Sequence, residues 1–274
     1  MPAGNEYTVD EIMAVCIARR LSDEVTVAQG IATPLVAAGY LLAKLTHAPN
    51  LRFASAIGQG ICQDWAPLGL ARTEALWLDK ALTTVGFITV AADLLPRLHP
   101  IEYLRPAQID AQGNFNNLAI GEDYWHPRMR LPGSGGIPDV SVVYSDMHLY
   151  VPRHSRAVFV PRVDVVSGLG HSPARRQGRG PVYLLSDLGQ FDWVDGRLRL
   201  FACHPGVTVE RVVAKTGCEL LIAPDLAETP PPAAEELRLL REEIDPLGLR
   251  KLEILGGAAR KALLRDILAQ EGAL

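Results

Sequence analysis

Apolar residues in the first half of the chain recur at helical spacing in some segments and form short β-branched runs in others. Residues 8–20 open with the capping box Thr8-x-x-Glu11 and continue with a helical apolar pattern, so they predict a helix. The run at 24–28 predicts a strand, and the glycine turn after it leads into a second helix over 35–45. Further strands are expected at residues 51–57, 86–90 and 140–143.

The second half is richer in short apolar runs that follow one another closely. They predict strands at residues 148–151, 157–160, 163–167, 181–185, 189–193 and 197–202. The dipeptide Asp195-Gly196 between the last two runs is a hairpin signal, so these two strands are expected to pair antiparallel. Helices are expected at 205–216, at 233–244 after a proline-rich linker over 229–232, and at 258–270.

Strands that alternate with helices predict an α/β fold with a mostly parallel central sheet, helices on both faces and additional antiparallel strands in the second half. We expect one domain over residues 1–252 and a helical extension over 253–274. The extension can pack on this chain or on a partner through an apolar face formed by Leu263, Leu264, Ile267 and Leu268. In such folds ligands bind outside the carboxyl ends of the strands, so the polar turns there are where a site is expected.

The composition narrows the classes of protein to which the chain can belong. With 274 residues, 48% of them hydrophobic and 21% charged, it can bury a sizeable core, which excludes global disorder. The 27 basic and 31 acidic residues give a net charge of −4, without the basic excess that phosphate binding in nucleic acids requires. No basic leader and no apolar run of about 18 residues is present, so neither targeting nor membrane insertion is expected and the predicted location is the cytoplasm.

The four cysteines give no sign of a metal or disulfide framework. They are scattered and form no Cys-x-x-Cys pair, so we expect reduced thiols and no metal site; they are Cys16, Cys62, Cys203 and Cys218. Cys62 is the one with an alternative role, as a thiol nucleophile. A buried structural thiol is favoured, because no neighbouring cation in the sequence would lower its pKa.

Three clusters of glycine and polar residues stand out, at 107–117, 126–136 and 163–170. They read AQIDAQGNFNN, HPRMRLPGSGG and VDVVSGLG. Together they resemble the β subunit of class I coenzyme A transferases of the glutaconate CoA-transferase type, in which A-Q-I-D-x-x-G-N-x-N is followed by H-P and G-S-G-G. The resemblance runs from Tyr7 to about Arg250. It implies the CoA-transferase α/β fold, a homologous α-type subunit in an αβ or α2β2 assembly, and an acyl-CoA substrate with no permanently bound cofactor.

Within this resemblance, two of the clusters supply candidate substrate-binding residues. The loop of Gly133, Ser134, Gly135 and Gly136 can present backbone N–H groups to a thioester without obstruction by Cβ atoms, although such a loop is also a common tight turn. Further candidates are the residues Gly58, Gln108, Gly113, Asn114, Asn116 and Asn117. The asparagines either orient a substrate carboxylate or thioester, or cap turns through their own backbone.

One departure from the family pattern bears on the reaction. Class I transferases carry a glutamate at the end of the second strand, which attacks the thioester, and counting from His47-Ala-Pro49 places Ala56 at that position. A methyl group is neither nucleophile nor base. The family includes a hydrolase that opens a carbon ring in steroid catabolism and a methylglutaconyl-CoA decarboxylase, both without this glutamate, so hydrolysis with C–C cleavage or decarboxylation is favoured. The alternatives are a true transferase with its nucleophile elsewhere and a non-catalytic acyl-CoA-binding subunit.

Cleavage of a C–C bond next to a carbonyl needs an acid or base, which can come from this chain or from its partner. Candidates here are Asp64, Asp93, Glu102 and His126, each of which is otherwise a solvated or structural residue. Several arginines are candidates for the phosphates of CoA or for an acidic acyl group: Arg153, Arg156, Arg162, Arg175, Arg176 and Arg179. An exposed loop is the favoured reading of residues 172–180.

Overall fold

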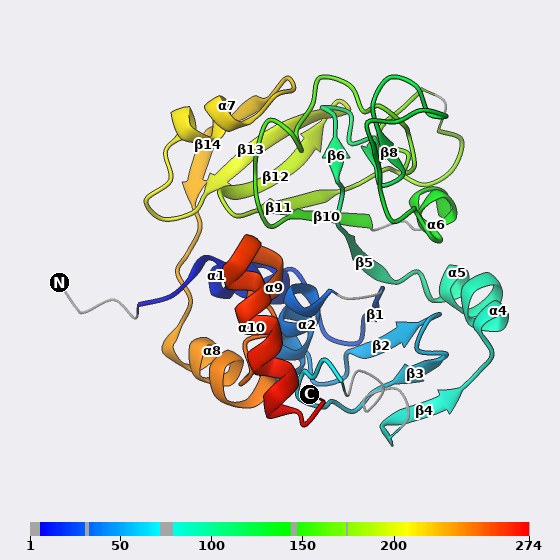
Figure 1. Cartoon of the computed structure of the whole chain (residues 1–274), viewed down its shortest axis with the longest axis vertical. Coiled ribbons are helices and arrows are strands. Elements are labelled where there is room, and N and C mark those ends of the chain that lie inside the picture. Colours follow the sequence, from blue (N-terminus) through cyan, green and yellow to red (C-terminus); the bar gives the residue numbers. More distant parts are fainter. Residues whose placement is uncertain (1–5, 31–32, 72–78, 144–146, 174, 274) are drawn as a thin grey trace. The chain divides into compact units, whose positions relative to one another are not determined.

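The computed structural model describes residues 6–30, 33–71, 79–143, 147–173 and 175–273 (Figure 1). The chain divides into two compact units. The first contains residues up to 100 together with those from 231 onward, and the second contains residues 101–230. Residues 253–274, for which we expected a helical extension, belong to the first unit. No helix in the described ranges has the length and apolar character that a membrane span requires.

The first unit combines a small sheet with several helices. Its strands lie in the order β1 (Thr26–Ala28), β2 (Arg52–Ser55), β3 (Gly60–Cys62) and β4 (Ala81–Thr84). β1 and β2 are parallel, whereas β3 is antiparallel to both of its neighbours. The helical segments are α1 (Val9–Arg19), α2 (Pro34–Thr46), α4 (Phe87–Thr89), the π-helix η1 (Val90–Leu94), α5 (Leu95–Leu98), α8 (Ala234–Arg238), the π-helix η2 (Leu239–Ile244), α9 (Lys251–Ile254) and α10 (Gly257–Gln270).

The core of the first unit forms around α1 and α2. The capping box of α1 is confirmed, since the Thr8 backbone N–H donates to the Glu11 carboxylate at 2.9 Å. Gly39 lets the two helices approach closely, because a Cβ at this position would lie 2.6 Å from the Ile17 side chain. In α10, Ile267 is buried against Leu249 and Leu252. The C-terminal helix α10 therefore packs on this chain along one side, and most of its surface is exposed.

The second unit holds a larger mixed sheet. Its strands lie in the order β14 (Leu221–Glu228), β13 (Arg197–Cys203), β12 (Gly189–Val194), β11 (Tyr183–Ser186), β10 (Met147–Val151) and β5 (Ile101–Leu104). β5, β10 and β11 form a parallel core, β12 is antiparallel to both neighbours, and β14 is parallel to β13. Two short ladders join β6 (Gln108–Ile109) to β7 (Phe115–Asn116) and β8 (Ala119–Ile120) to β9 (Met129–Arg130). The helices are α6 (Ile137–Val143) and α7 (Val209–Lys215).

The α/β fold with a parallel core and added antiparallel strands is confirmed, and antiparallel strands also occur in the first half of the chain. The Asp195-Gly196 hairpin is confirmed as well, with φ angles of 51° and 72° that suit a two-residue turn. The predicted strands at 148–151, 181–185, 189–193 and 197–202 correspond to β10, β11, β12 and β13.

Four predicted strands are wrong. Residues 86–90 and 140–143 are mainly helical, because short β-branched runs do not by themselves distinguish a strand from a helix. The second of these belongs to α6, where Pro138 and Asp139 in the first turn are helix-start signals. Residues 157–160 and 163–167 form no strand. Within the described structure, the first stretch has one isolated bridge at Phe159, and the second is followed by one at Gly168.

Candidate functional site

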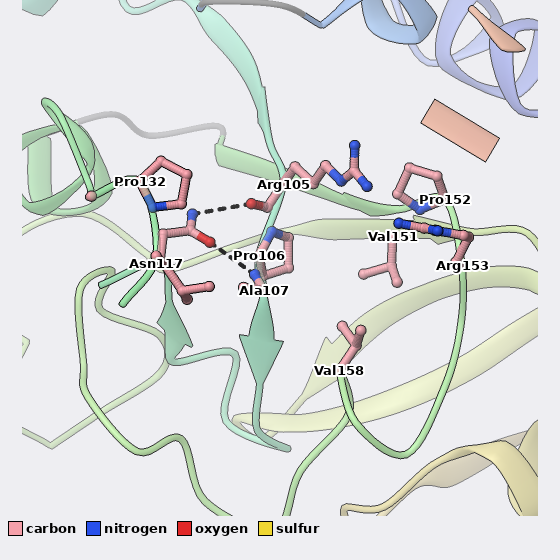
Figure 2. Close-up of a pocket in the computed structure, with 11 residues that line it drawn as sticks. Arg105, Pro106, Ala107, Asn117, Pro132, Val151, Pro152, Arg153 and Val158 are labelled. Carbon is pink, nitrogen blue, oxygen red and sulfur yellow. Dashed lines mark hydrogen bonds between the residues drawn. The ribbon is translucent and has the colours of Figure 1, made fainter. Parts of the chain in front are cut away.

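A pocket of about 480 Å³ opens in the second unit where two parallel strands end (Figure 2). Arg105 and Pro106 follow β5 directly, and Pro152 and Arg153 follow β10. Since β5 and β10 are parallel neighbours, their carboxyl ends meet at one edge of the sheet. The remaining lining residues are Ala107, Asn117, Leu131, Pro132, Gly133, Val151 and Val158.

Asn117 fixes the walls of this pocket. Its side-chain amide donates to the Arg105 carbonyl at 3.0 Å and accepts from the Ala107 backbone N–H at 2.8 Å, as Figure 2 shows. Its backbone N–H donates to the Ser167 hydroxyl at 2.9 Å, and its carbonyl accepts from the Gly133 N–H at 3.2 Å. One asparagine therefore positions three segments that line the pocket or support it.

The charge of the pocket is carried by two arginines. Arg105 and Arg153 are both exposed, and in Figure 2 their side chains extend toward one another across the opening. Among the described residues, no carboxylate lines the pocket. Paired guanidinium groups recognise carboxylate or phosphate oxygens through several N–H donors, so this pocket suits an anionic group.

Gln108 and Asn116 of the first polar cluster form an internal network. The Asn116 side chain, which is fully buried, donates to Gln108 Oε1 at 2.7 Å and to the Ala119 carbonyl at 2.6 Å. Gln108 Nε2 donates to Asp164 Oδ2 at 3.1 Å, which ties the first cluster to the third. The structure therefore places both side chains in contacts within the chain.

Asn114 and Gly113 also serve this internal framework. The Asn114 side chain donates to Asp110 Oδ2 at 3.0 Å and accepts from the Gly170 N–H at 2.9 Å. Gly113 adopts a φ of +77°, and a Cβ there would lie 2.7 Å from Pro181 and 3.0 Å from the Trp193 ring. A Cβ at Gly170 would lie 2.3 Å from backbone atoms of this same turn, so the turn requires glycine at both positions for close packing.

The Gly-Ser-Gly-Gly loop is exposed and precedes α6 directly. Gly133 and Gly135 have φ angles of 113° and 52°, which favour glycine, and no heavy atom lies within 4 Å of a Cβ built at either residue. The Ser134 carbonyl accepts from the Ile137 N–H at 3.0 Å. Gly133 lines the pocket, whereas Ser134, Gly135 and Gly136 do not.

Ala56 lies in the first unit, in the turn between β2 and β3. The hydroxyl of Ser55 accepts from the Gly58 N–H at 2.9 Å and donates to the Gln29 carbonyl at 2.9 Å, and these bonds shape the turn. Gln59 completes it with a φ of 51°. Ala56 is half-buried and offers only a methyl group at the end of the strand.

Similarity to known proteins decides the family. No protein-family model matches the chain. It is 31% identical to the B-type subunit of 3-oxoadipate CoA-transferase from Pseudomonas knackmussii over 86% of this chain and 92% of that protein. It is 30% identical to the B-type subunit of glutaconate CoA-transferase from Acidaminococcus fermentans, over 88% and 93% of the two chains. The chain belongs to the class I CoA-transferase family, as a β-type subunit.

Other members of this family carry names of different reactions. The IpdB component of the cholesterol ring-cleaving hydrolase of Mycobacterium tuberculosis is 32% identical over 89% of this chain and 97% of that protein. Among solved structures, the decarboxylase AibA/AibB superposes with a TM-score of 0.79 at 29% identity, covering 91% of this chain and 99% of the other. The CoA-transferase fold thus occurs in transferases, a hydrolase and a decarboxylase.

Three of the four acid–base candidates are exposed to solvent. Asp64 is exposed and lies 3.0 Å from the Lys80 ammonium group, whose hydrogen bond lowers the carboxyl pKa. Asp93 is exposed on η1. His126 is exposed and its Nδ1 lies 2.8 Å from Asp123 Oδ2.

Glu102 has a different environment. It lies on β5, three residues before Arg105, and is only 9% exposed. Its register partner on β10 is Met147, and burial raises its carboxyl pKa to about 7. A carboxyl group of this kind exchanges protons near neutral pH. By contrast, burial raises the pKa of the Cys62 thiol to about 11, which keeps it protonated and unreactive.

Of the arginines considered from the sequence, Arg153 lines the pocket. Arg156 donates to the Thr216 carbonyl at 3.1 Å, and Arg175 donates to the Gly170 carbonyl at 2.9 Å, so both support the chain itself. The sequence analysis did not select Arg105, because it did not predict β5. A strand prediction at residues 101–104 would have pointed to this arginine, since it directly follows the strand. Within the described residues, no group of three or more His, Cys, Asp or Glu side chains is arranged as a metal site.

Proposed function

We propose that this chain is the β-type subunit of a two-subunit enzyme that acts on an acyl-CoA thioester of a carboxylic acid by hydrolysis with C–C cleavage or by decarboxylation. CoA would enter and leave as part of the substrate and product. The partner would be a homologous α-type subunit in an αβ or α2β2 assembly, as the two-part name AibA/AibB and the subunit naming of glutaconate CoA-transferase suggest for relatives. Four free cysteines are in keeping with a reducing, cytoplasmic location.

The observation that carries this proposal is Ala56 in the turn after β2. By the family resemblance, this is where a transferase holds the glutamate that takes the acyl group from CoA. A methyl group forms no such bond. The sequence contains no Asp or Glu between Glu24 and Asp64, so no neighbouring carboxylate in the chain substitutes for it.

The pocket at the ends of β5 and β10 supports an anionic substrate. Arg105 and Arg153 would bind a carboxylate of the acyl group or a phosphate of CoA. The hydrogen bonds of Asn117 to the backbone of Arg105 and Ala107 would hold this wall of the pocket in place, so that its backbone needs little ordering when the substrate binds.

Either reaction breaks a C–C bond and leaves its electron pair on a carbon conjugated to the thioester carbonyl, as an enolate. Protonation of that carbon completes the reaction, and hydrolysis additionally requires a base to deprotonate water. Glu102 is the residue of this chain that we propose for proton transfer, because it is buried on β5, the strand that leads to Arg105 at the pocket, and burial raises its carboxyl pKa to about 7. A base on the α-type subunit would fill the remaining role.

The relative named as a 3-oxoadipate CoA-transferase supports one alternative, a true transferase with its nucleophile elsewhere. The two functions differ in one intermediate: a transferase forms a covalent enzyme–CoA adduct, whereas the proposed enzyme does not. We would incubate the α/β complex with acyl-CoA, and record the intact mass of both subunits before and after hydroxylamine. The proposal predicts no adduct. A hydroxylamine-sensitive CoA adduct on either subunit would support the transferase, whereas binding without any turnover would support a non-catalytic subunit.

A further inference from the structure

A buried histidine directly follows one of the two pocket arginines. Arg153 is exposed at the opening, whereas the side chain of the next residue, His154, is buried. Val158 lines the same pocket, and in Figure 2 the chain runs from Arg153 through a loop to Val158. His154 therefore lies inside a loop that borders the pocket at both of its ends.

Both ring nitrogens of His154 form hydrogen bonds, and these bonds determine its tautomer. The Thr216 hydroxyl donates its one hydrogen to the Val212 carbonyl at 2.8 Å, so Nε2–H of His154 donates to the Thr216 oxygen, 3.0 Å away. Nδ1 of the neutral ring is then the acceptor for the Ser186 hydroxyl at 3.0 Å. The Leu188 N–H in turn donates to Ser186 Oγ at 3.1 Å. Burial lowers the pKa of His154 to about 3, so the ring stays neutral at physiological pH.

Further contacts fix the backbone and the ring plane of His154. Its backbone N–H donates to Asp187 Oδ1 at 2.6 Å. Its ring stacks on Phe159, with 3.8 Å between the ring centroids and an interplanar angle of 10°. The Phe159 carbonyl accepts from the Gly217 N–H at 2.9 Å. These contacts fasten the loop at 153–158 to the end of β11 and to the segment that follows α7.

The same unit contains a second buried histidine without this relation to the pocket. The ring nitrogens of His204 lie 3.1 Å from Thr229 Oγ1 and 2.9 Å from the Ser186 carbonyl oxygen. Burial lowers its pKa to about 4, so it is also neutral. Within the described structure, neither of its chain neighbours, Cys203 and Pro205, lines the pocket. His204 is therefore a matched comparison for His154 in burial, hydrogen bonding and charge.

We propose that His154 is a positioning residue for the pocket: its ring, held between the Ser186 and Thr216 hydroxyls, keeps Arg153 in place to bind a carboxylate or phosphate group. This inference rests on the proposed anion-binding role of the pocket. An exposed guanidinium binds an anion well only if its backbone is already fixed, because ordering a loop during binding costs free energy. His154 acts through Arg153 and, being buried, does not touch the substrate.

The test measures binding to the α/β complex by isothermal titration. The probes are CoA, which carries the phosphates, and the carboxybutyl thioether of CoA, which adds a carboxylate. Neither probe contains a thioester, so the result does not depend on which reaction the enzyme catalyses. The variants are Arg153→Ala, His154→Phe and their combination, with His204→Phe as the control. His154→Phe keeps an aromatic ring against Phe159 but loses both hydrogen bonds of the imidazole.

We expect Arg153→Ala and His154→Phe each to weaken binding about 10-fold. The double variant should bind about as tightly as Arg153→Ala alone, because both changes act on the same guanidinium, whereas the control should change the affinity by no more than about twofold. A loss for the thioether alone would identify a carboxylate as the bound group, and an equal loss for both probes would identify a phosphate.

Thr216→Val provides a second measurement if His154→Phe does not fold. It removes one hydrogen bond of the ring and should weaken binding about threefold, whereas Thr216→Ser keeps the hydroxyl and should retain the wild-type affinity. Additive losses in the double variant, an equal loss in His204→Phe, or unchanged affinity of Thr216→Val would each overturn the positioning role and leave the pocket's proposed role intact. Unchanged affinity of Arg153→Ala for both probes would overturn the proposed anion-binding role, and this inference with it.

Discussion

The Arg250 guanidinium lies 2.9 Å from Asp245 Oδ2, and both side chains are buried. The same guanidinium lies 2.8 Å from Asp10 and 3.1 Å from Glu11, both on α1. One arginine thus joins the segment before α9 to the first helix of the chain. In a buried cluster the opposite charges compensate one another. Removal of one partner leaves an uncompensated buried charge, and this destabilises the fold more than replacement of the whole cluster by apolar residues would.

Replacement of this arginine should therefore destabilise the first unit. Arg250→Met leaves three carboxylates with fewer partners in a buried place, and we expect a loss of about 3–5 kcal/mol in the free energy of unfolding. Urea unfolding of the two proteins measures it. Arg238→Ala is the matched control, because Arg238 forms ion pairs with Glu235 and Glu243 at the exposed surface and should change stability little. Equal stability of Arg250→Met and wild type would contradict this account.

The same cluster predicts an acid-sensitive transition. Burial alone would raise the Glu11 pKa, but hydrogen bonds from Arg241 and Thr8 and the charge of Arg250 outweigh it and lower the pKa from 4.5 to about 2. A lowered pKa contributes stability above pH 4.5 that is lost as the pH falls toward 2. We expect Glu11→Gln to flatten this part of the stability curve, measured by urea unfolding at several pH values. A variant with the full wild-type slope between pH 4.5 and 2 would show that Glu11 is not responsible.

Glu102 should show the opposite sign. Its pKa is raised from 4.5 to about 7. The contribution of Glu102 to the free energy of unfolding is therefore most favourable below pH 4.5 and is lost as the pH rises through 7. Glu102→Gln removes this loss, and we expect a gain of up to about 3 kcal/mol at pH 8, measured by urea unfolding.

If Glu102 also transfers the proton, the same Gln variant should lower kcat by about 100-fold or more. The combination of higher alkaline stability and lower kcat separates a proton-transfer role from a structural one, for which the stability gain would come without loss of activity. A pH–rate profile that keeps its limb near pH 7 in the variant would exclude Glu102 as its source.

Arg105 and Arg153 should control substrate affinity. Each Ala substitution removes charge-assisted hydrogen bonds to an anion, and we expect kcat/KM to fall about 10- to 100-fold, with the effect smaller at high salt. Arg162→Ala is the control, since Arg162 is exposed and does not line the pocket. Steady-state kinetics at two ionic strengths measures both effects. An equal effect of the control substitution would mean that general surface charge, and not the pocket, attracts the substrate.

The sequence correctly predicted features that depend on interactions between neighbouring residues. The capping box at Thr8 and the Asp195-Gly196 turn both depend on groups within a few residues of each other, and both are present. The stretches at 86–90 and 140–143 were misassigned because β-branched residues also occur in short helices. β5 was not predicted, since Glu102 interrupts its apolar pattern.

The candidate site depends on contacts between distant parts of the chain, which a single sequence does not reveal. Arg105 and Arg153 line the same pocket because β5 and β10 pair in parallel. Gln108 was chosen as a pocket residue, but it hydrogen-bonds to Asp164, 56 residues away. Family resemblance pointed to the three polar clusters, whereas only the structure shows which of their side chains make internal contacts and which line the pocket.

We propose that Ala56 marks an enzyme that does not carry CoA as a glutamyl thioester. The most direct measurement is mass-resolved turnover of a panel of acyl-CoA thioesters by the α/β complex, with and without a carboxylate acceptor. Loss of CO2, addition of water and transfer of CoA each change the product mass differently. We expect products that form at the same rate without the acceptor. Product that forms only with the acceptor would contradict the account and identify a CoA-transferase.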